Sequence, residues 1–240
     1  MKQKHDSLPT IKPLVVKELT KILNNYHNNI TEIVDLGAGS QPQIFLALKD
    51  EFIFNYCAID KDIKKLELFR ERSKVKLSKK LRTVCSNVEN TPLKSSSYNI
   101  IIFLETIEHL KYPEKALKEI VRIAKQNATI FISTPNIQRP DIYLKRVLFF
   151  LIRSNKNYPK DYYYSPDHTK EWKIKDFNSL LKKSNLIPIK SFLVTYPLEF
   201  VGFKSLVTLI IYSLINIIML TFKIHSFSPI YLTLCKVDKK

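Results

Sequence analysis

The stretch Glu32–Ser40, with the sequence EIVDLGAGS, holds two of the three glycines in a chain of 240 residues. Residues 30–36 read as a short buried β-strand, and the two glycines after it permit a tight turn in which the backbone approaches a ligand. Helix-forming residues resume at Ile44. A strand, a glycine turn and a helix start form the first unit of a nucleotide-binding α/β sheet, whose ligand lies beyond the carboxyl end of the strand.

A second apolar run, residues 52–59, ends in Asp60, about 20 residues after Gly39. An acidic side chain at this offset can accept hydrogen bonds from both hydroxyl groups of a ribose. The turn differs from the dinucleotide-binding type, because Gln41-Pro42 stands where a third glycine would come and no close approach to a pyrophosphate is provided. The sequence therefore predicts a nucleoside ligand without phosphates.

From about Thr31 to Asn136 the chain resembles the class I S-adenosylmethionine-dependent methyltransferases, in particular their small-molecule and lipid branch. Three further stretches carry the resemblance: SNVENTPL at 86–93, YNIIIFLETIEHL at 98–110 and ISTPN at 132–136. The resemblance implies an α/β, Rossmann-like fold with a seven-stranded, mostly parallel sheet, helices on both faces and a final antiparallel strand.

The resemblance also implies S-adenosyl-L-methionine as the cofactor. The cofactor-binding residues that it implies are Asp35, Gly37, Ala38, Gly39, Asp60, Lys61, Asn87, Val88 and Glu105. Asp35, Gly37 and Gly39 belong to the methionine side, Asp60 to the ribose and Asn87-Val88 to the adenine. The chain departs from the family pattern at Asn87, where an acid is usual, and at Gln126-Asn127, which replaces a glycine turn. Asparagine tolerates the left-handed conformation that such a turn needs.

Two histidines are candidate catalytic bases for methyl transfer to an oxygen atom. His109 follows the fourth predicted strand and His168 lies in the loop 165–169, so both fall on the ligand side of the sheet. A general base adds ~10²- to 10⁴-fold to what positioning of the reactants provides. The alternative for His109 is a loop residue bonded to backbone, and for His168 a surface residue. Glu105 and Glu108 either line the pocket or cap the helix that opens at Pro113.

Competing chemistries leave few traces in the sequence. It contains neither the Asn-Pro-Pro-Tyr motif of amino methylation on bases nor the Pro-Cys pair of pyrimidine C5 attack. It has no His-x-x-x-His and no paired-cysteine spacing, so no metal site is predicted. Methylation of an oxygen atom is therefore the predicted reaction.

Length and composition suit one α/β domain, since 45% of 240 residues are hydrophobic. We expect a single methyltransferase domain over 1–240, with an N-terminal helix within 1–29, a cofactor-binding half at 30–136 and an acceptor-side half at 137–240. The three cysteines include no close pair, and the first 30 residues hold no classical secretory signal. A cytoplasmic protein is therefore expected.

The net charge of +17 has three explanations: binding to nucleic acid, binding to an anionic membrane, or a lysine-rich proteome. Residues 139–190 mix basic and aromatic side chains, a composition typical of surfaces that bind large anionic or amphipathic molecules. We expect 155–169 to act as a lid over the acceptor. Within the predicted apolar helix 204–223, the apolar run 206–221 is about 24 Å long. This is shorter than the ~30 Å hydrocarbon core, so the helix is predicted to lie at the inner face of the membrane and not to cross it. Burial against the sheet or in a dimer contact is the alternative.

Together these features predict a methyltransferase that acts on an oxygen of a small or lipid-linked amphipathic acceptor at a membrane surface. Two alternatives stay open. Charge and aromatic residues favour an RNA methyltransferase, although no appended RNA-binding module is recognised. A cofactor-binding protein without turnover fits the same motifs. The acceptor and the oligomeric state are not specified by these residues.

Overall fold

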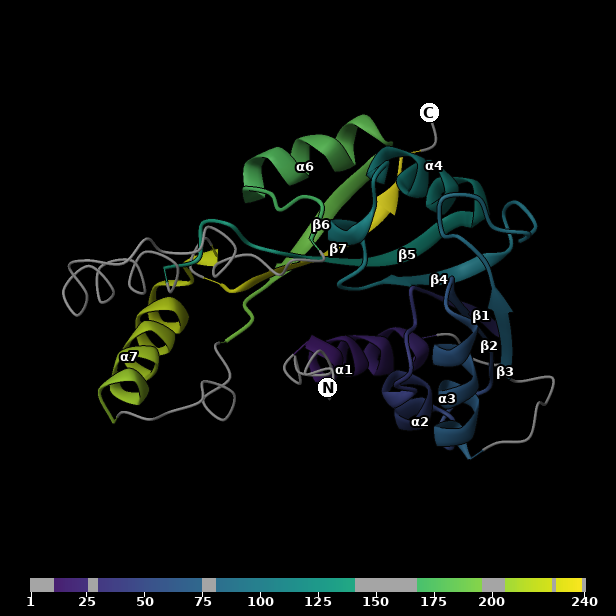
Figure 1. Cartoon of the computed structure of the whole chain (residues 1–240), viewed down its shortest axis with the longest axis horizontal. Helices are drawn as coiled ribbons and strands as arrows, with labels where there is room; N and C mark the ends of the chain where they lie inside the picture. Colours follow the sequence, from purple (N-terminus) through teal and green to yellow (C-terminus); the bar gives the residue numbers. More distant parts are fainter. Residues whose placement is uncertain are drawn as a thin grey trace.

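The computed structural model describes residues 11–25, 30–74, 81–140, 168–195, 206–225 and 228–238. A single sheet runs through the molecule (Figure 1). Its strands are β1 (Thr31–Leu36), β2 (Phe54–Asp60), β3 (Leu81–Cys85), β4 (Tyr98–Phe103), β5 (Ala124–Pro135), β6 (Leu186–Phe192) and β7 (Ile230–Val237). Their order is β3-β2-β1-β4-β5-β7-β6. Strands β1 to β5 pair in parallel, while β7 is antiparallel to β5 and β6. The predicted seven-stranded Rossmann-like sheet is confirmed.

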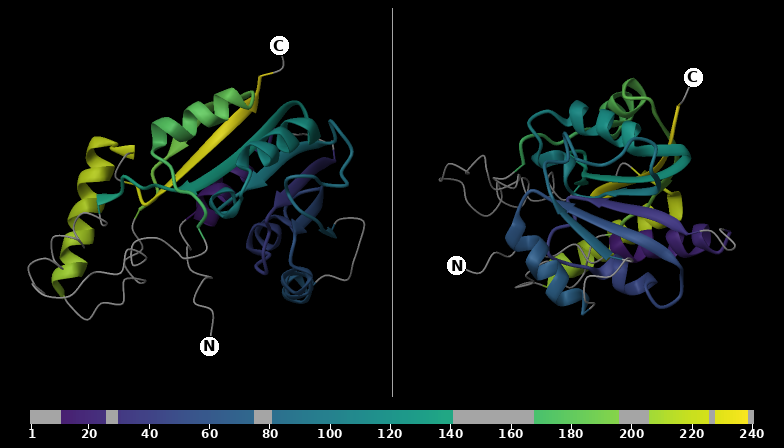
Figure 2. Two further views of the ribbon diagram at one scale, coloured as in Figure 1. Left: turned by 45° about the horizontal axis from the view of Figure 1, so that its top comes forward. Right: turned by 90° about the vertical axis from the view of Figure 1, so that its right-hand side faces the viewer.

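Helices cover both faces of this sheet. The described helices are α1 (Ile11–Leu23), α2 (Gln43–Leu48), α3 (Ile63–Ser73), the 3-10 helix η1 (Ile107–His109), α4 (Pro113–Ile123), α6 (Ile174–Lys183) and α7 (Leu206–Phe222). Figures 1 and 2 show α4 and α6 on one face and α1, α2 and α3 on the other. Because side chains alternate along a strand, β1 supplies both layers: Val34 packs with α4 and α6, and Ile33 with α1 to α3.

The order of the strands decides where a ligand can lie. β1 is flanked by β2 on one side and by β4 on the other. The chain leaves β1 toward α2 on one face and leaves β4 through η1 toward α4 on the opposite face. Loops that diverge in this way open a crevice at the carboxyl ends of the strands, which is where open α/β sheets bind ligands.

Local details place individual residues. Ile63, the first residue of α3, is 50% exposed, whereas Leu66 and Phe69 on the same helix are buried. Ala124 is the first residue of β5. Asn127 has a φ of 65°, the left-handed conformation that the sequence predicted there.

Two segments that the sequence marks out lie outside the described part of the chain. The apolar, basic stretch 142–153, whose pattern predicts a helix, lies wholly outside it, and of the predicted lid 155–169 only His168 and Thr169 are described.

Helix α7 stands away from the sheet (Figures 1 and 2). Six of its large apolar side chains are between 43% and 70% exposed, namely Ile210, Leu214, Ile217, Ile218, Leu220 and Phe222. The predicted helix is therefore present, and it is not buried against the sheet along this face. None of the helices in the described ranges combines the length and apolar character needed to cross a membrane.

Candidate functional site

The glycine turn after β1 is held by the neighbouring strand. The backbone N–H groups of Gly37 and Ala38 both donate to the carbonyl of Ile59, at 2.8 and 2.9 Å. Gly37 and Gly39 have φ values of 75° and 64°, which residues with a side chain rarely adopt. A Cβ atom at Gly37 would overlap the side chain of Thr106, whereas one at Gly39 would meet nothing within 4 Å. The open side of the turn is therefore at Gly39, while Gly37 accommodates the loop after β4.

Asp60, at the end of β2, completes the turn. Its Oδ2 accepts from the N–H of Gly39 at 3.0 Å, and its Oδ1 accepts from the N–H of Asp62 at 2.9 Å. A carboxylate has about four lone-pair positions. Asp60 can therefore hold the backbone in place and still accept from two ribose hydroxyls. Lys61, the next residue, is exposed.

Asp35 lies near the carboxyl end of β1 and is only 8% exposed. Its Oδ2 accepts from the hydroxyl of Tyr56 at 2.7 Å. Burial raises the pKa of Asp35 from 3.8 to about 6, against the opposing effects of the Tyr56 hydrogen bond and of Lys12. A cationic amino group placed beside this carboxylate would favour its ionised form.

The loop predicted to hold the adenine follows β3. Val88 is buried in the core, and Asn87 is exposed with its Oδ1 accepting from the N–H of Glu89 at 3.0 Å. The Asn87 amide N–H₂ therefore remains as a donor toward a base edge. Glu119 anchors the loop from α4, since its Oε1 accepts from the N–H of Thr91 at 2.9 Å.

The loop between β4 and η1 contains a residue with a strained backbone conformation. Glu105 has a φ of 47°, its N–H donates to Ser133 Oγ at 2.9 Å, and its Oε1 accepts from the same hydroxyl at 2.6 Å. Backbone strain of this kind costs ~1–3 kcal/mol and persists where neighbouring contacts fix the conformation. The predicted capping of α4 by Glu105 or Glu108 is not observed. Its N-cap residue is Tyr112, whose N–H donates instead to Glu89 at 3.3 Å.

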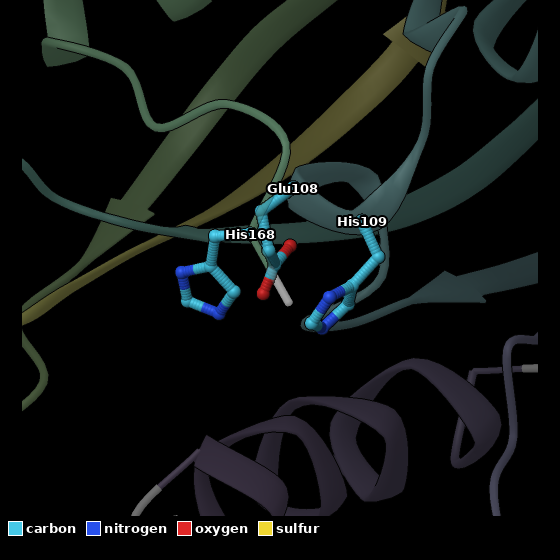
Figure 3. Close-up of side chains that lie close together, drawn as sticks. All are labelled: Glu108, His109 and His168. Atoms are coloured by element: carbon cyan, nitrogen blue, oxygen red, sulfur yellow. The ribbon is translucent and has the colours of Figure 1, made fainter. Parts of the chain in front are cut away.

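The segment that begins at His168 is fastened to η1. The N–H groups of Thr169 and Lys170 both donate to the carbonyl of Glu108, at 2.7 and 3.2 Å. This pairing brings the rings of His109 and His168 to a centroid separation of 5.0 Å. Figure 3 shows the Glu108 carboxylate between the two rings. The two histidines predicted as candidate bases thus share one site, and His168, with 16% of its side chain exposed, is not an open surface residue.

Three carboxyl groups surround these histidines. Glu171 Oε1 lies 2.7 Å from His168 Nδ1. Burial raises the pKa of Glu105 to about 7, against the Ser133 hydrogen bond and the charge of His168. Burial also raises the pKa of Glu108 well above its usual value, and the neighbouring Glu105 adds to this effect. A carboxyl group with a pKa near 7, such as Glu105, can take up or release a proton near neutral pH.

Sequence reasoning missed this cluster as a unit. It singled out both histidines and Glu105, but it considered Glu108 only as a pocket or capping residue and did not consider Glu171. The adjacent Glu108-His109 pair was a usable signal. Its partner His168 becomes apparent only through the fold.

Comparison with known proteins agrees with the fold. Residues 34–132 match a family model described as a methyltransferase domain. An uncharacterized protein of Methanocaldococcus jannaschii is 26% identical over 137 residues, which are 57% of this chain and 54% of the relative. The chain thus spans about half the length of that relative.

Solved structures share the architecture. The small RNA methyltransferase HEN1 superimposes with a TM-score of 0.64 at 15% identity, covering 100% of this chain and 27% of that chain. A SAM-dependent methyltransferase of Archaeoglobus fulgidus gives 0.57 at 17% identity, with 94% of each chain covered. The domain match and the fold together support the predicted class, S-adenosylmethionine-dependent methyltransferases. They likewise support the predicted cofactor, S-adenosyl-L-methionine.

Proposed function

We propose that the protein methylates an oxygen atom of an acceptor that binds beside His109 and His168. The proposal depends on the proximity of two sites. These are the histidine cluster (Glu105, Glu108, His109, His168 and Glu171) and the cofactor turn (residues 37–39 with Asp60). Thr106, two residues before Glu108, fills the space beside Gly37. The bound cofactor supplies an electrophilic methyl group. An acceptor at the histidine cluster would therefore lie next to the methionine side of the cofactor.

The chemistry asks little of the protein beyond orientation and removal of one proton. Asp35, Gly37 and Gly39 would hold the methionine side of the cofactor, which would give up its methyl group to the acceptor oxygen with the carbon–sulfur electron pair left on sulfur. The hydroxyl proton passes to an imidazole nitrogen of His109 or His168. Holding the reactants in line supplies most of the acceleration, and the base adds ~10²- to 10⁴-fold.

The proposed acceptor is small or lipid-linked and amphipathic, presented at a membrane surface. Exposed apolar side chains on α7 support this, including Leu214 and Ile217 at 52% and 59%. Residues 200–237 contain no acidic residue, and Lys223 follows the helix directly. An apolar helix face flanked by basic residues is suited to the interface of an anionic bilayer.

RNA is the second candidate acceptor. The net charge of +17 favours it, and one structural neighbour, HEN1, is a small RNA methyltransferase. Binding carried by phosphate contacts weakens steeply as salt is raised, which distinguishes it from apolar membrane contact.

Incubation with radiolabelled S-adenosylmethionine and separated lipid, RNA and small-molecule fractions tests the proposal. We expect label in the lipid or small-molecule fraction. We also expect His168→Ala to lower turnover about 100-fold, the size of a lost general base, with unchanged cofactor affinity. His225→Ala, a histidine outside the cluster, is the matched control.

Each other outcome contradicts part of the proposal. Label in RNA alone would replace the acceptor class. Cofactor binding without transfer to any fraction would identify a non-catalytic binding protein. Full turnover by His168→Ala would remove His168 as a base.

Sedimentation with anionic liposomes tests the membrane contact separately. We expect wild type to sediment and Leu214→Asp with Ile217→Asp to stay in solution. The paired control is Ile187→Asp with Ile189→Asp, because these β6 side chains are 41% and 55% exposed and lie on another element. Equal sedimentation of both variants would exclude α7 as the contact.

A further inference from the structure

Three side chains of the histidine cluster have the chemistry of metal ligands. Glu108, His109 and His168 each offer one ligand atom, and these atoms lie within 4.8 Å of one another. Figure 3 shows the three side chains converging from η1 and from the segment at His168. The two segments are fixed to each other by the hydrogen bond from the N–H of Thr169 to the carbonyl of Glu108, at 2.7 Å. The convergence is thus built by backbone contacts.

A second observation points to a bound cation. Glu108 is 1% exposed, and its Oε2 has no hydrogen-bond partner among the described residues. Leaving a buried polar atom without a partner is costly, and more so where the group is charged. A cation placed between the rings would satisfy this oxygen.

A third observation concerns the orientation of His168. Its Nδ1 lies 2.7 Å from Glu171 Oε1, so Nε2 is the nitrogen that remains for a ligand. A histidine held through its other ring nitrogen by a carboxylate is the usual arrangement at protein metal sites. The side chain of Glu171 is only 2% exposed, which holds this carboxylate in place.

We propose that Glu108, His109 and His168 bind one divalent transition-metal ion, with Glu171 as the residue that orients His168. Two imidazoles and one carboxylate suit manganese, iron, cobalt or zinc better than magnesium or calcium, which prefer ligand sets made of oxygen. Metal–ligand bonds of about 2.0–2.2 Å place the ligand atoms about 3–4 Å apart. Small side-chain rotations bring the three atoms into that range.

Three protein ligands leave coordination positions open. On the proposed oxygen methylation, on which this step rests, the acceptor hydroxyl occupies one of them. Coordination would lower the pKa of that hydroxyl and release its proton to solvent. The two histidines would then be ligands, and the metal would take the place of the imidazole base in removing the hydroxyl proton.

Metal binding is measured directly on the full chain. The protein is stripped with a chelator, dialysed and titrated with Mn²⁺ followed by electron paramagnetic resonance. We expect one bound Mn²⁺ per chain. Loss of an orienting carboxylate typically costs 10- to 100-fold in metal affinity, so Glu171→Gln is expected in that range. His109→Ala and His168→Ala, which remove ligands, are expected to lose at least as much.

Two controls separate metal binding from folding and from function. His225→Ala should bind Mn²⁺ as wild type does, and thermal unfolding should show that each variant remains folded. Calorimetry of the metal-free protein with S-adenosylmethionine reports the cofactor site alone. After cofactor binding is verified, chelator should abolish transfer and Mn²⁺ should restore it.

The outcomes are distinguishable. If wild type binds no Mn²⁺, Co²⁺ or Zn²⁺ at millimolar concentration but binds the cofactor, the metal site is excluded and the methyltransferase proposal stands. The same holds if His109→Ala and His168→Ala bind the ion as tightly as wild type. If the cofactor does not bind, the proposed function fails whatever the metal result.

Discussion

The cofactor turn and the histidine cluster lie side by side but differ in how their polar groups are satisfied. In the turn, both oxygens of Asp60 accept from backbone N–H groups, at 2.9 and 3.0 Å. In the cluster, Glu108 and Glu171 each keep one buried carboxylate oxygen without a partner among the described residues. The carboxylate of Asp60 is already hydrogen-bonded, and a ligand would add further contacts to it. The cluster instead has buried carboxylate oxygens to which a ligand would be the first partner.

The largest expected effect breaks the turn. Gly37→Ala places a Cβ against Thr106 at a φ of 75°. Overpacking and the left-handed backbone together should lower the free energy of unfolding by about 2–4 kcal/mol. Gly39→Ala shares the left-handed cost but has open space, so about 1 kcal/mol is expected. Urea unfolding of both variants measures the difference, and equal losses would show that Thr106 does not restrict the turn.

Removing Asp60 tests its proposed contact with the ribose. A lost hydrogen-bond partner that carries charge costs ~1.5–3 kcal/mol, so Asp60→Ala should weaken cofactor binding about tenfold to a hundredfold in calorimetry. Asp62→Ala is the control. It removes the acceptor of the Lys64 N–H at the start of α3, at 2.9 Å, but leaves Gly39 bonded. This control should lose about 1 kcal/mol of stability with unchanged affinity. Unchanged affinity in Asp60→Ala would exclude Asp60 from the site.

The raised pKa of Asp35 predicts a pH dependence. Because the folded pKa, about 6, exceeds the usual 3.8, the folded chain keeps a proton that the unfolded chain releases. The contribution of Asp35 is therefore most favourable at low pH and is lost as pH rises through about 6. Relative to Asp35→Asn, wild type should lose about 2 kcal/mol of stability between about pH 4.5 and 7.5. A constant difference across this range would contradict the shift.

The smallest expected effect lies in the cluster. Ser133→Ala removes the hydroxyl that accepts from the N–H of Glu105 and donates to its Oε1. A loss of about 1 kcal/mol is expected in urea unfolding. The neighbouring Thr134 is the matched control, because its buried hydroxyl has no partner among the described residues. Thr134→Val should stay within ~0.5 kcal/mol of wild type, and a greater loss there than in Ser133→Ala would reverse the assignment.

The two regions also differ in how far the sequence predicts them. The turn depends on local spacing, since a strand, Gly37, Gly39 and the acid at Asp60 follow one another within one β-α-β unit. The fold followed from the same unit repeated. The sequence predicts that Gly37 allows the backbone to approach a ligand closely. It does not predict the close approach to Thr106, which requires a glycine for the same reason.

The cluster depends on contacts that no local pattern encodes. Glu108 and His168 are far apart in the chain and meet through backbone hydrogen bonds from Thr169 and Lys170. Glu171 is one acid among 22 acidic residues, and nothing in its neighbourhood marks it before the fold is known. Patterns such as His-x-x-x-His identify ligands on one helix and cannot identify a site assembled from separate segments.

The packing of Thr106 against Gly37 leaves the two sites without clearance between them. A ligand that displaces Gly37 must also displace Thr106, and with it the loop that leads to Glu108 and His109. Thermodynamic linkage makes such communication reciprocal: whatever the cofactor contributes to affinity at the cluster, an occupant of the cluster returns to the cofactor. If the proposed methyl transfer takes place, release of the spent cofactor and release of the methylated product would therefore be coupled.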